Sequence, residues 1–166
     1  LSTNACIEDK GCRAKLIVFG MTDELLTRFK GEEKYGISRD SVKCVDTNSS
    51  ADGLIVDEPD WNEFEEKFKD WIADAEILST SELYSVYNGA PCEKKLKELS
   101  RDRFDITCVC ANEITSEINV IQRGATALLN ARLLPMVQEF IKSIIKDFRA
   151  RGCTSPIMIV RSDGSL

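Results

Sequence analysis

Short apolar runs alternate with longer amphipathic stretches along this chain of 166 residues, and this alternation restricts the possible folds more than any other feature. Each apolar run has the length of one strand, whereas the stretches between them have the periodicity of helices that cover a sheet. The expected strands are residues 15–19, 42–45, 54–56, 76–79, 106–110 and 156–160. The sequence therefore predicts an α/β fold in which a mostly parallel sheet is flanked by helices.

Local signals mark where several helices begin. Thr22 can cap a helix that starts at Asp23. Asp60 and Glu63 have the spacing of a capping box. An apolar stripe at helical spacing follows, formed by Trp61, Phe64, Phe68 and Trp71. We interpret this stripe as part of the core and not as a ligand-binding aromatic box.

The last third of the chain is strongly helical. Residues 120–134 and 135–151 are predicted as two helices, because Pro135 fits the first turn of a helix, where its missing N–H would be unpaired anyway. The second helix leads into residues 156–160, which are apolar throughout. This run is therefore expected to form a central, parallel strand.

Composition excludes several classes of function. The 22 basic and 28 acidic residues give a net charge of -6, which disfavours nucleic acid or an anionic membrane as a partner. No apolar run approaches the ~20 residues that span a bilayer. The chain contains no His, so it cannot by itself build a Ser-His-Asp triad, a Cys-His dyad or a His-ligated zinc site. A domain of this size can bury a core without disulfides or metals.

The seven cysteines point to a reduced chain. Their number is odd, no Cys-x-x-Cys pair occurs, and several lie in apolar runs. These features favour a cytoplasmic protein without disulfides or a bound metal. Cys108 and Cys110 flank Val109 in an expected strand, so their side chains should share one face of the sheet as small buried hydrophobic groups.

Polar residues follow the last expected strand. Arg161, Ser162 and Asp163 lie at its carboxyl end, where open α/β sheets place their sites. Arg161 could pair with a carboxylate or phosphate, and Asp163 could bind a metal or orient water. Ser-Asp-Gly is also ordinary turn chemistry, so the sequence leaves both interpretations open.

Two further polar residues lie on a predicted helix. Arg123 and Asn130 are seven residues apart, about two turns, and therefore share a face. They could join Ser162 and Asp163 in one substrate-binding site that also includes Arg161. Alternatively, they tie the helix to neighbouring loops through buried hydrogen bonds. No catalytic residue or metal ligand is assigned, and the chain contains no glycine-rich loop for a nucleotide.

Three motifs resemble one enzyme family. Residues 122–135, Gln-Arg-Gly-Ala-Thr-Ala-Leu-Leu-Asn-Ala-Arg-Leu-Leu-Pro, resemble the Glu-Arg-Thr-Ser-Thr-x-x-Leu-Asn-Ala-x-x-x-Pro signature of the hydantoinase/oxoprolinase A-subunit family. Residues 156–164 are similar to its Pro-Leu-x-x-x-Gln-Ser-Asn-Gly motif. Residues 2–11 are similar to its Ala-Thr-Asn-Ala-x-x-Glu-x-Lys-Gly motif. Together the matches span nearly the whole chain in the family's order.

The resemblance implies a multi-domain, ATP-dependent enzyme of the ribonuclease H-like/actin-like ATPase superfold. Members open cyclic amides such as hydantoins and 5-oxoproline, and relatives carboxylate ketones. Two glycine-rich loops hold the ATP phosphates, and neither is expected in this chain. Residues 1–166 would then be one α/β domain of a longer A subunit, taken from the segment between the two loops and reaching the entry to the next lobe.

Such a fragment is expected to be inactive alone. Turnover would require ATP, Mg²⁺, the remainder of the A subunit and possibly a B subunit, with a small cyclic amide as substrate. Homo-oligomers of the chain are possible, and no cofactor is expected in the fragment itself.

Departures from the family pattern leave a second interpretation open. Cys92 lies where the family's Asn-Pro-x-His-Glu turn has His, and Gly124 and Ala125 replace Thr-Ser. Arg161 and Asp163 replace Gln and Asn. These changes fall at polar positions where the family would contact substrate. A non-catalytic activator or sensor ATPase-like domain, or an interaction domain of the same superfold, is therefore the alternative.

Overall fold

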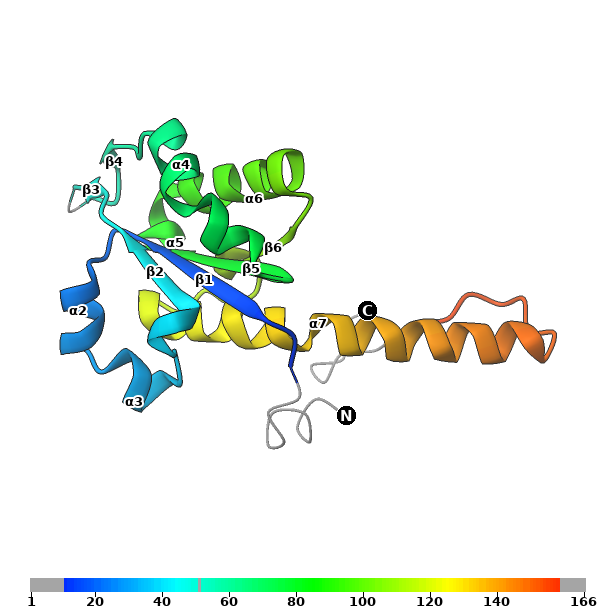
Figure 1. Cartoon of the computed structure of the whole chain (residues 1–166). Coiled ribbons are helices and arrows are strands. Elements are labelled where there is room, and N and C mark those ends of the chain that lie inside the picture. Colours follow the sequence, from blue (N-terminus) through cyan, green and yellow to red (C-terminus); the bar gives the residue numbers. More distant parts are fainter. Residues whose placement is uncertain (1–10, 51, 159–166) are drawn as a thin grey trace.

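The computed structural model describes residues 11–50 and 52–158, and its centre is a parallel sheet (Figure 1). Four strands lie in the order β2-β1-β5-β6, and every neighbouring pair is parallel. They are β1 (Ala14–Phe19), β2 (Val42–Val45), β5 (Ile77–Glu82) and β6 (Thr107–Cys110). The predicted fold class is confirmed.

Helices cover both faces of this sheet (Figure 1). One face carries α4 (Trp61–Ala73) and α6 (Pro91–Phe104). The opposite face carries α7 (Val120–Ala150), with α2 (Asp23–Arg28) and α3 (Gly31–Tyr35) beside it. The shorter elements are η1 (Arg39–Ser41), β3 (Asn48–Ser49), β4 (Ile55–Asp57), α5 (Ser85–Asn88) and η2 (Ala111–Glu113). The expected strand at residues 54–56 corresponds to β4, which pairs with β3 in a separate antiparallel ladder.

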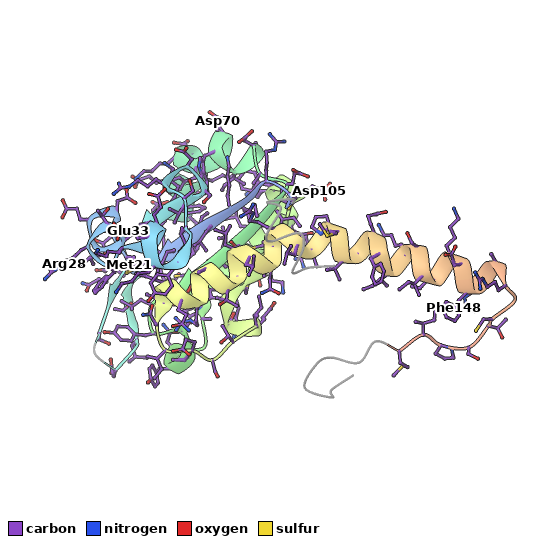
Figure 2. The ribbon with its side chains drawn as sticks, turned by 90° about the horizontal axis from the view of Figure 1, so that it is seen from below. Met21, Arg28, Glu33, Asp70, Asp105 and Phe148 are labelled. Atoms are coloured by element: carbon purple, nitrogen blue, oxygen red, sulfur yellow. The ribbon has the colours of Figure 1, made fainter. Side chains whose placement is uncertain are left out.

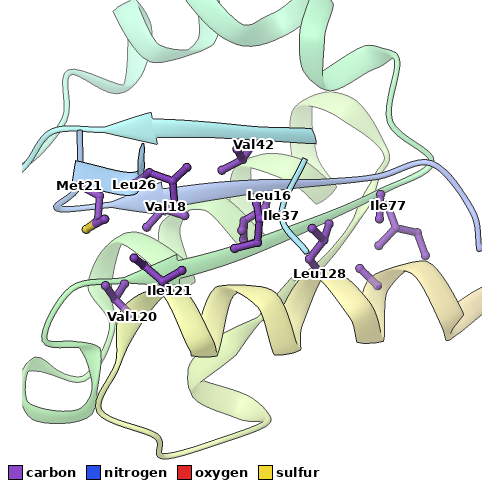
Figure 3. Packing of buried hydrophobic residues seen from close by; sticks show 12 residues of the cluster. Leu16, Val18, Met21, Leu26, Ile37, Val42, Ile77, Val120, Ile121 and Leu128 are labelled. Carbon is purple, nitrogen blue, oxygen red and sulfur yellow. The ribbon is translucent and has the colours of Figure 1, made fainter. Parts of the chain in front are cut away.

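The core lies on both sides of β1, whose residues are all buried because it is a central strand. Leu16 and Val18 point to the α7 side, where Figure 3 shows them packed near Leu128 and Ile121. Ile17 and Phe19 alternate to the other side and pack under α4 and α6. Cys108 and Cys110 are likewise both buried, whereas the intervening Val109 is partly exposed, so their predicted shared face is confirmed.

The predicted start and core face of α4 are also confirmed. One carboxylate oxygen of Asp60 accepts hydrogen bonds from the N–H groups of Asn62 and Glu63, at 2.9 and 3.1 Å. Phe64 and Phe68 are buried, and the rings of Trp61 and Trp71 pack partly buried against the same cluster. The stripe is therefore core. Thr22 caps α2 as predicted, by accepting from the N–H of Leu25.

Residues 120–150 form one helix and not the two predicted from Pro135. Proline deprives the carbonyl of Ala131 of its helical donor. The thiol of Cys12 donates to that oxygen at 3.4 Å, and the N–H of Cys12 donates to the carbonyl of Arg132 at 3.0 Å. Because the segment before β1 supplies donors at this point, the helix continues through Pro135.

The predicted strand at residues 156–160 is not formed where the structure describes it. Residues 156–158 have no strand conformation, and Ile159 and Val160 lie outside the described residues. Residues 152–158 instead run back beside the outer part of α7 (Figure 1). Across residues 11–50 and 52–158, none of the helices combines the length and the apolar character that a membrane crossing requires.

Close packing of α7 on the sheet depends on Gly124. A Cβ added there would lie 3.2 Å from Leu16 Cδ2 and 3.4 Å from Ser81 Cβ. We expect Gly124→Val to lower the free energy of unfolding by about 1–3 kcal/mol through overpacking. Gly124→Ala should stay within about 1 kcal/mol of the parent, because gained helix propensity offsets the tighter contact. Urea unfolding measures both changes. An unchanged free energy of unfolding in Gly124→Val would contradict this packing.

Candidate functional site at the carboxyl edge of the sheet

The carboxyl ends of all four parallel strands meet at one edge, which is where open α/β sheets bind their ligands. Two fully buried acidic residues and one fully buried arginine gather at the ends of β5 and β6. Glu82 is the last residue of β5, Glu93 lies in the first turn of α6, and Arg123 lies in the first turn of α7. Their exposed fractions are 1%, 0% and 0%.

Glu82 and Glu93 bind each other's main chain. One carboxylate oxygen of Glu82 accepts from the N–H groups of Cys92 and Glu93, at 2.9 and 3.2 Å. In return, the Glu93 carboxylate accepts from the N–H of Glu82 at 3.0 Å and from the N–H of Asn112 at 2.9 Å. Glu82 thereby caps α6 in place of a local N-cap side chain, and Glu93 joins the ends of β5 and β6.

Arg123 closes the same cluster from the other face of the sheet. Its guanidinium donates to the carbonyls of Glu82, Glu117 and Ile118, at 2.5, 2.5 and 2.7 Å. Burial lowers the pKa of Arg123, while the nearby Glu93 and Glu82 oppose that shift. Among the described residues, its Nε has no hydrogen-bond partner. We call Glu82, Glu93 and Arg123 the carboxylate–arginine brace.

Burial dominates the titration of both carboxyls in the brace. It raises the pKa of Glu93 to about 7, against the opposing effect of the N–H groups of Asn112 and Glu82. Burial also raises the pKa of Glu82, against the hydrogen bonds from Glu93, Asn88 and Cys92. Taking a charge out of water disfavours its ionised form, so both groups resist ionisation more than ordinary glutamates do.

The brace fixes a turn of unusual backbone, residues 83–91. Tyr84 and Ala90 both have left-handed conformations, with φ of 62° and 57°. Asn88 accepts from the N–H of Ala90 at 2.9 Å and donates to Glu82 at 3.0 Å, which ties the turn to the brace. Strained residues of this kind cluster at ligand clamps and switch regions. Tyr87 also lies on this turn, with 66% of its surface exposed, and is the most accessible aromatic side chain there.

The structure describes two of the site residues expected from sequence, Arg123 and Asn130. Arg123 is in the brace, but Asn130 is exposed and donates to the carbonyl of Thr126 at 2.8 Å on its own helix. Arg161, Ser162 and Asp163 lie outside the described residues, so the predicted shared site is untested. Glu82 and Glu93 were missed by sequence reasoning. For Glu82 the available signal was the polar run from Ser79 to Glu82 at the end of a buried strand, and for Glu93 it was the last position of the turn that resembles the family's Asn-Pro-x-His-Glu motif.

Among the described residues, no group of three or more His, Cys, Asp or Glu side chains is placed to hold a metal ion. The six described cysteines are free. Burial raises the pKa of Cys44 to about 12, and burial followed by the charge of Glu82 raises that of Cys92. A high thiol pKa leaves little thiolate, so neither cysteine is suited to act as a nucleophile.

Comparison with solved structures finds the same fold in segments of two larger proteins. Over 93% of its length the chain superposes on the ATP-dependent caprolactamase from Pseudomonas jessenii, with a TM-score of 0.73 and 22% sequence identity. This chain has the fold of that enzyme's matching segment. A second solved structure, a nucleotide-free acetone carboxylase, matches 91% of the chain with a TM-score of 0.69 and 19% identity. At these identities the similarity establishes the fold and nothing further.

Sequence comparisons find fewer and weaker similarities than the structural ones. No family model matches the chain. An uncharacterized protein of Methanocaldococcus jannaschii is 27% identical over 94 residues, which cover 56% of this chain and 14% of that protein. The chain likewise spans 24% and 25% of the caprolactamase and carboxylase chains. It therefore corresponds to about a quarter or less of these three proteins.

Proposed function

We propose that the chain is part of a larger ATP-dependent enzyme that opens a cyclic amide. The observation that carries this proposal is the superposition of 93% of the chain on a segment of an ATP-dependent caprolactamase. Caprolactam is itself a cyclic amide. The sequence signature at residues 122–135 supports the same class independently, since it resembles enzymes that open hydantoin and 5-oxoproline rings. Hydantoin or 5-oxoproline is the finer substrate proposal.

ATP supplies the driving force in this reaction. Transfer of the γ-phosphoryl group to the amide oxygen releases ADP and makes the ring carbon electrophilic. Water then adds to that carbon and the ring C–N bond breaks, so that the ring nitrogen leaves as the amine. A second water hydrolyses the remaining acyl phosphate to the carboxylate and inorganic phosphate, so one cyclic amide, one ATP and two waters give one amino acid, ADP and phosphate. The protein contributes mainly positioning and charge. ATP and Mg²⁺ would be bound by other parts of the parent protein, which we place in the cytoplasm, with a B subunit as a possible partner.

The brace gives this chain a defined task in that enzyme. Its groups are buried and bind mainly main-chain atoms, which favours a positioning role over direct contact with substrate. They hold residues 83–91 and 111–119 rigidly at the carboxyl edge, where a ligand would lie. Those two segments, together with Asn130, Arg161, Ser162 and Asp163, are the proposed substrate side of this domain.

The complete gene product that contains this chain provides the test. With Mg·ATP, phosphate release should rise at least about tenfold when hydantoin, 5-oxoproline or caprolactam is added, since catalysis requires the reacting amide. An open-chain secondary amide is the matched control and should have little effect. Release that instead requires a ketone and bicarbonate would favour carboxylation. Release that depends on no small molecule would favour the sensor or interaction domain.

The isolated chain should bind ATP weakly. Its sequence contains no glycine-rich phosphate loop, so the main-chain donors that hold a triphosphate are lacking. We expect a Kd for Mg·ATP above about 100 µM, which corresponds to binding weaker than about -5.5 kcal/mol. Isothermal calorimetry measures this directly. Tighter binding would show that the chain carries a nucleotide site of a different kind.

A further inference from the structure

The outer half of α7, residues 135–150, projects beyond the sheet (Figures 1 and 2). All residues of α7 that are buried lie between Val120 and Ala131. Beyond this point the helix has several large apolar side chains in contact with water. Phe140 is 50% exposed and Phe148 is 49% exposed, and Figure 2 shows Phe148 near the far end of the projection. A monomeric protein rarely leaves such a contiguous surface open.

This apolar surface is not a continuation of the face that packs on the sheet. Steps of three and four residues from the buried Ala131 lead to Pro135, Gln138 and Lys142, so the sheet-facing side becomes polar. The apolar side chains run along a different line through Leu133, Val137, Phe140, Ile144 and Phe148, of which Phe140 and Phe148 are exposed and the other three are half-buried. The sheet therefore does not cover it, and the apolar side chains that stay exposed beside residues 152–158 need a second apolar surface from another side.

We propose that the outer half of α7 docks in an apolar groove of further polypeptide in the same parent protein. The proposal rests on the proposed function only for the existence of that polypeptide. Superposition on the caprolactamase leaves about twelve of the 166 residues unmatched, fewer than the sixteen residues of the projection. At least part of the projecting helix therefore belongs to the shared fold. About three quarters of the caprolactamase chain lies outside the match and provides polypeptide for such a groove.

Charge disfavours a second copy of this chain as the occupant. Residues 135–151 contain four basic and two acidic side chains. Two copies docked face to face would bring two positively charged segments together, which weakens association. The apolar line is also broad, since Met136, Ile141 and Ile145 widen it. A broad stripe fits the core of a larger protein better than the narrow seam of a paired coiled coil.

Hydrogen exchange in the complete protein and in the 166-residue chain tests the docking. In the complete protein, the amides of residues 136–148 should exchange at least about 100-fold more slowly than in the chain alone. Phe140→Asp in the complete protein should remove this protection. Gln138→Asp introduces the same charge on the polar side of the helix and should preserve the protection from exchange. Both variants of the isolated chain should unfold at the parental urea midpoint, because neither position contributes to its core.

Equal exchange in the complete protein and in the chain would overturn the proposal. So would a dimer of the isolated chain that Phe140→Asp dissociates, combined with an unprotected helix in the complete protein. If anionic lipid vesicles alone slowed exchange in the outer half of α7, this apolar surface would instead bind a membrane. Each result is read from exchange rates or mass, so it is independent of whether the complete protein hydrolyses ATP with a cyclic amide.

Discussion

We expect Arg123→Met to lower the free energy of unfolding by about 3–5 kcal/mol, because it breaks the carboxylate–arginine brace. The substitution leaves the carbonyls of Glu82, Glu117 and Ile118 without their guanidinium donors in a buried region. It also removes the one positive charge of the brace, next to the Glu82 and Glu93 carboxyls. Urea unfolding at pH 7.5 measures the loss.

Two further variants test whether the lost hydrogen bonds of Arg123 cause this fall in the free energy of unfolding. Arg123→Lys keeps the charge but not the planar fork that reaches three carbonyls, so it should lose an intermediate amount. Asn130→Ala should change the free energy of unfolding by less than about 0.5 kcal/mol, since its side chain is exposed and bonds only within its own helix. A loss below 1 kcal/mol for Arg123→Met would contradict the brace.

Arg123→Met also distinguishes a positioning role of Arg123 from direct contact with the substrate. In the complete enzyme, a positioning role predicts that Arg123→Met lowers turnover no more than the fraction of protein that it unfolds. A direct role at the substrate predicts lost turnover in protein that is still folded. Complete burial of Arg123 and its three main-chain partners favour the scaffold. Measuring turnover and melting temperature on the same samples distinguishes the two.

Local signals in the sequence predicted local structure well. Thr22 and Asp60 mark helix starts because a cap needs only the next three residues. The run at residues 15–19 indicates a buried strand because both of its faces are apolar. These features depend on neighbours in the chain, so a single sequence is sufficient to identify them.

Features that depend on distant residues could not be predicted. Pro135 correctly signals a missing N–H, but the compensating donor is Cys12, 119 residues away from the carbonyl of Ala131 that it binds. Glu93 lies in a helix rich in charged residues, and its place in the first turn, three residues before Leu96, does not by itself predict that a carboxylate is fully buried there. Its burial arises only because β5 and β6 end beside the start of α6. The brace is therefore a tertiary feature.

The buried Glu93 should make the stability of the domain fall as the pH rises from about 5 to 8. Its folded-state pKa of about 7 exceeds the ordinary value of 4.5, so the folded state binds a proton that the unfolded state has lost. The stabilisation is fully present below pH 4.5 and is lost as the pH rises through 7. A shift of this size corresponds to about 3 kcal/mol. The raised pKa of Glu82 acts in the same direction.

Urea unfolding at half-unit steps between pH 5 and 8 measures this slope, and Glu93→Gln should flatten it. The substitution also places an amide beside main-chain N–H donors, so its absolute stability should be lower, and the slope is the informative quantity. Glu98→Gln, an exposed position on the same helix, should keep the parental slope. Stability that rises with pH in the parent, with an unchanged slope in Glu93→Gln, would mean that Glu93 is ionised in the fold at little cost. The main-chain donors from Glu82 and Asn112 would then offset its burial.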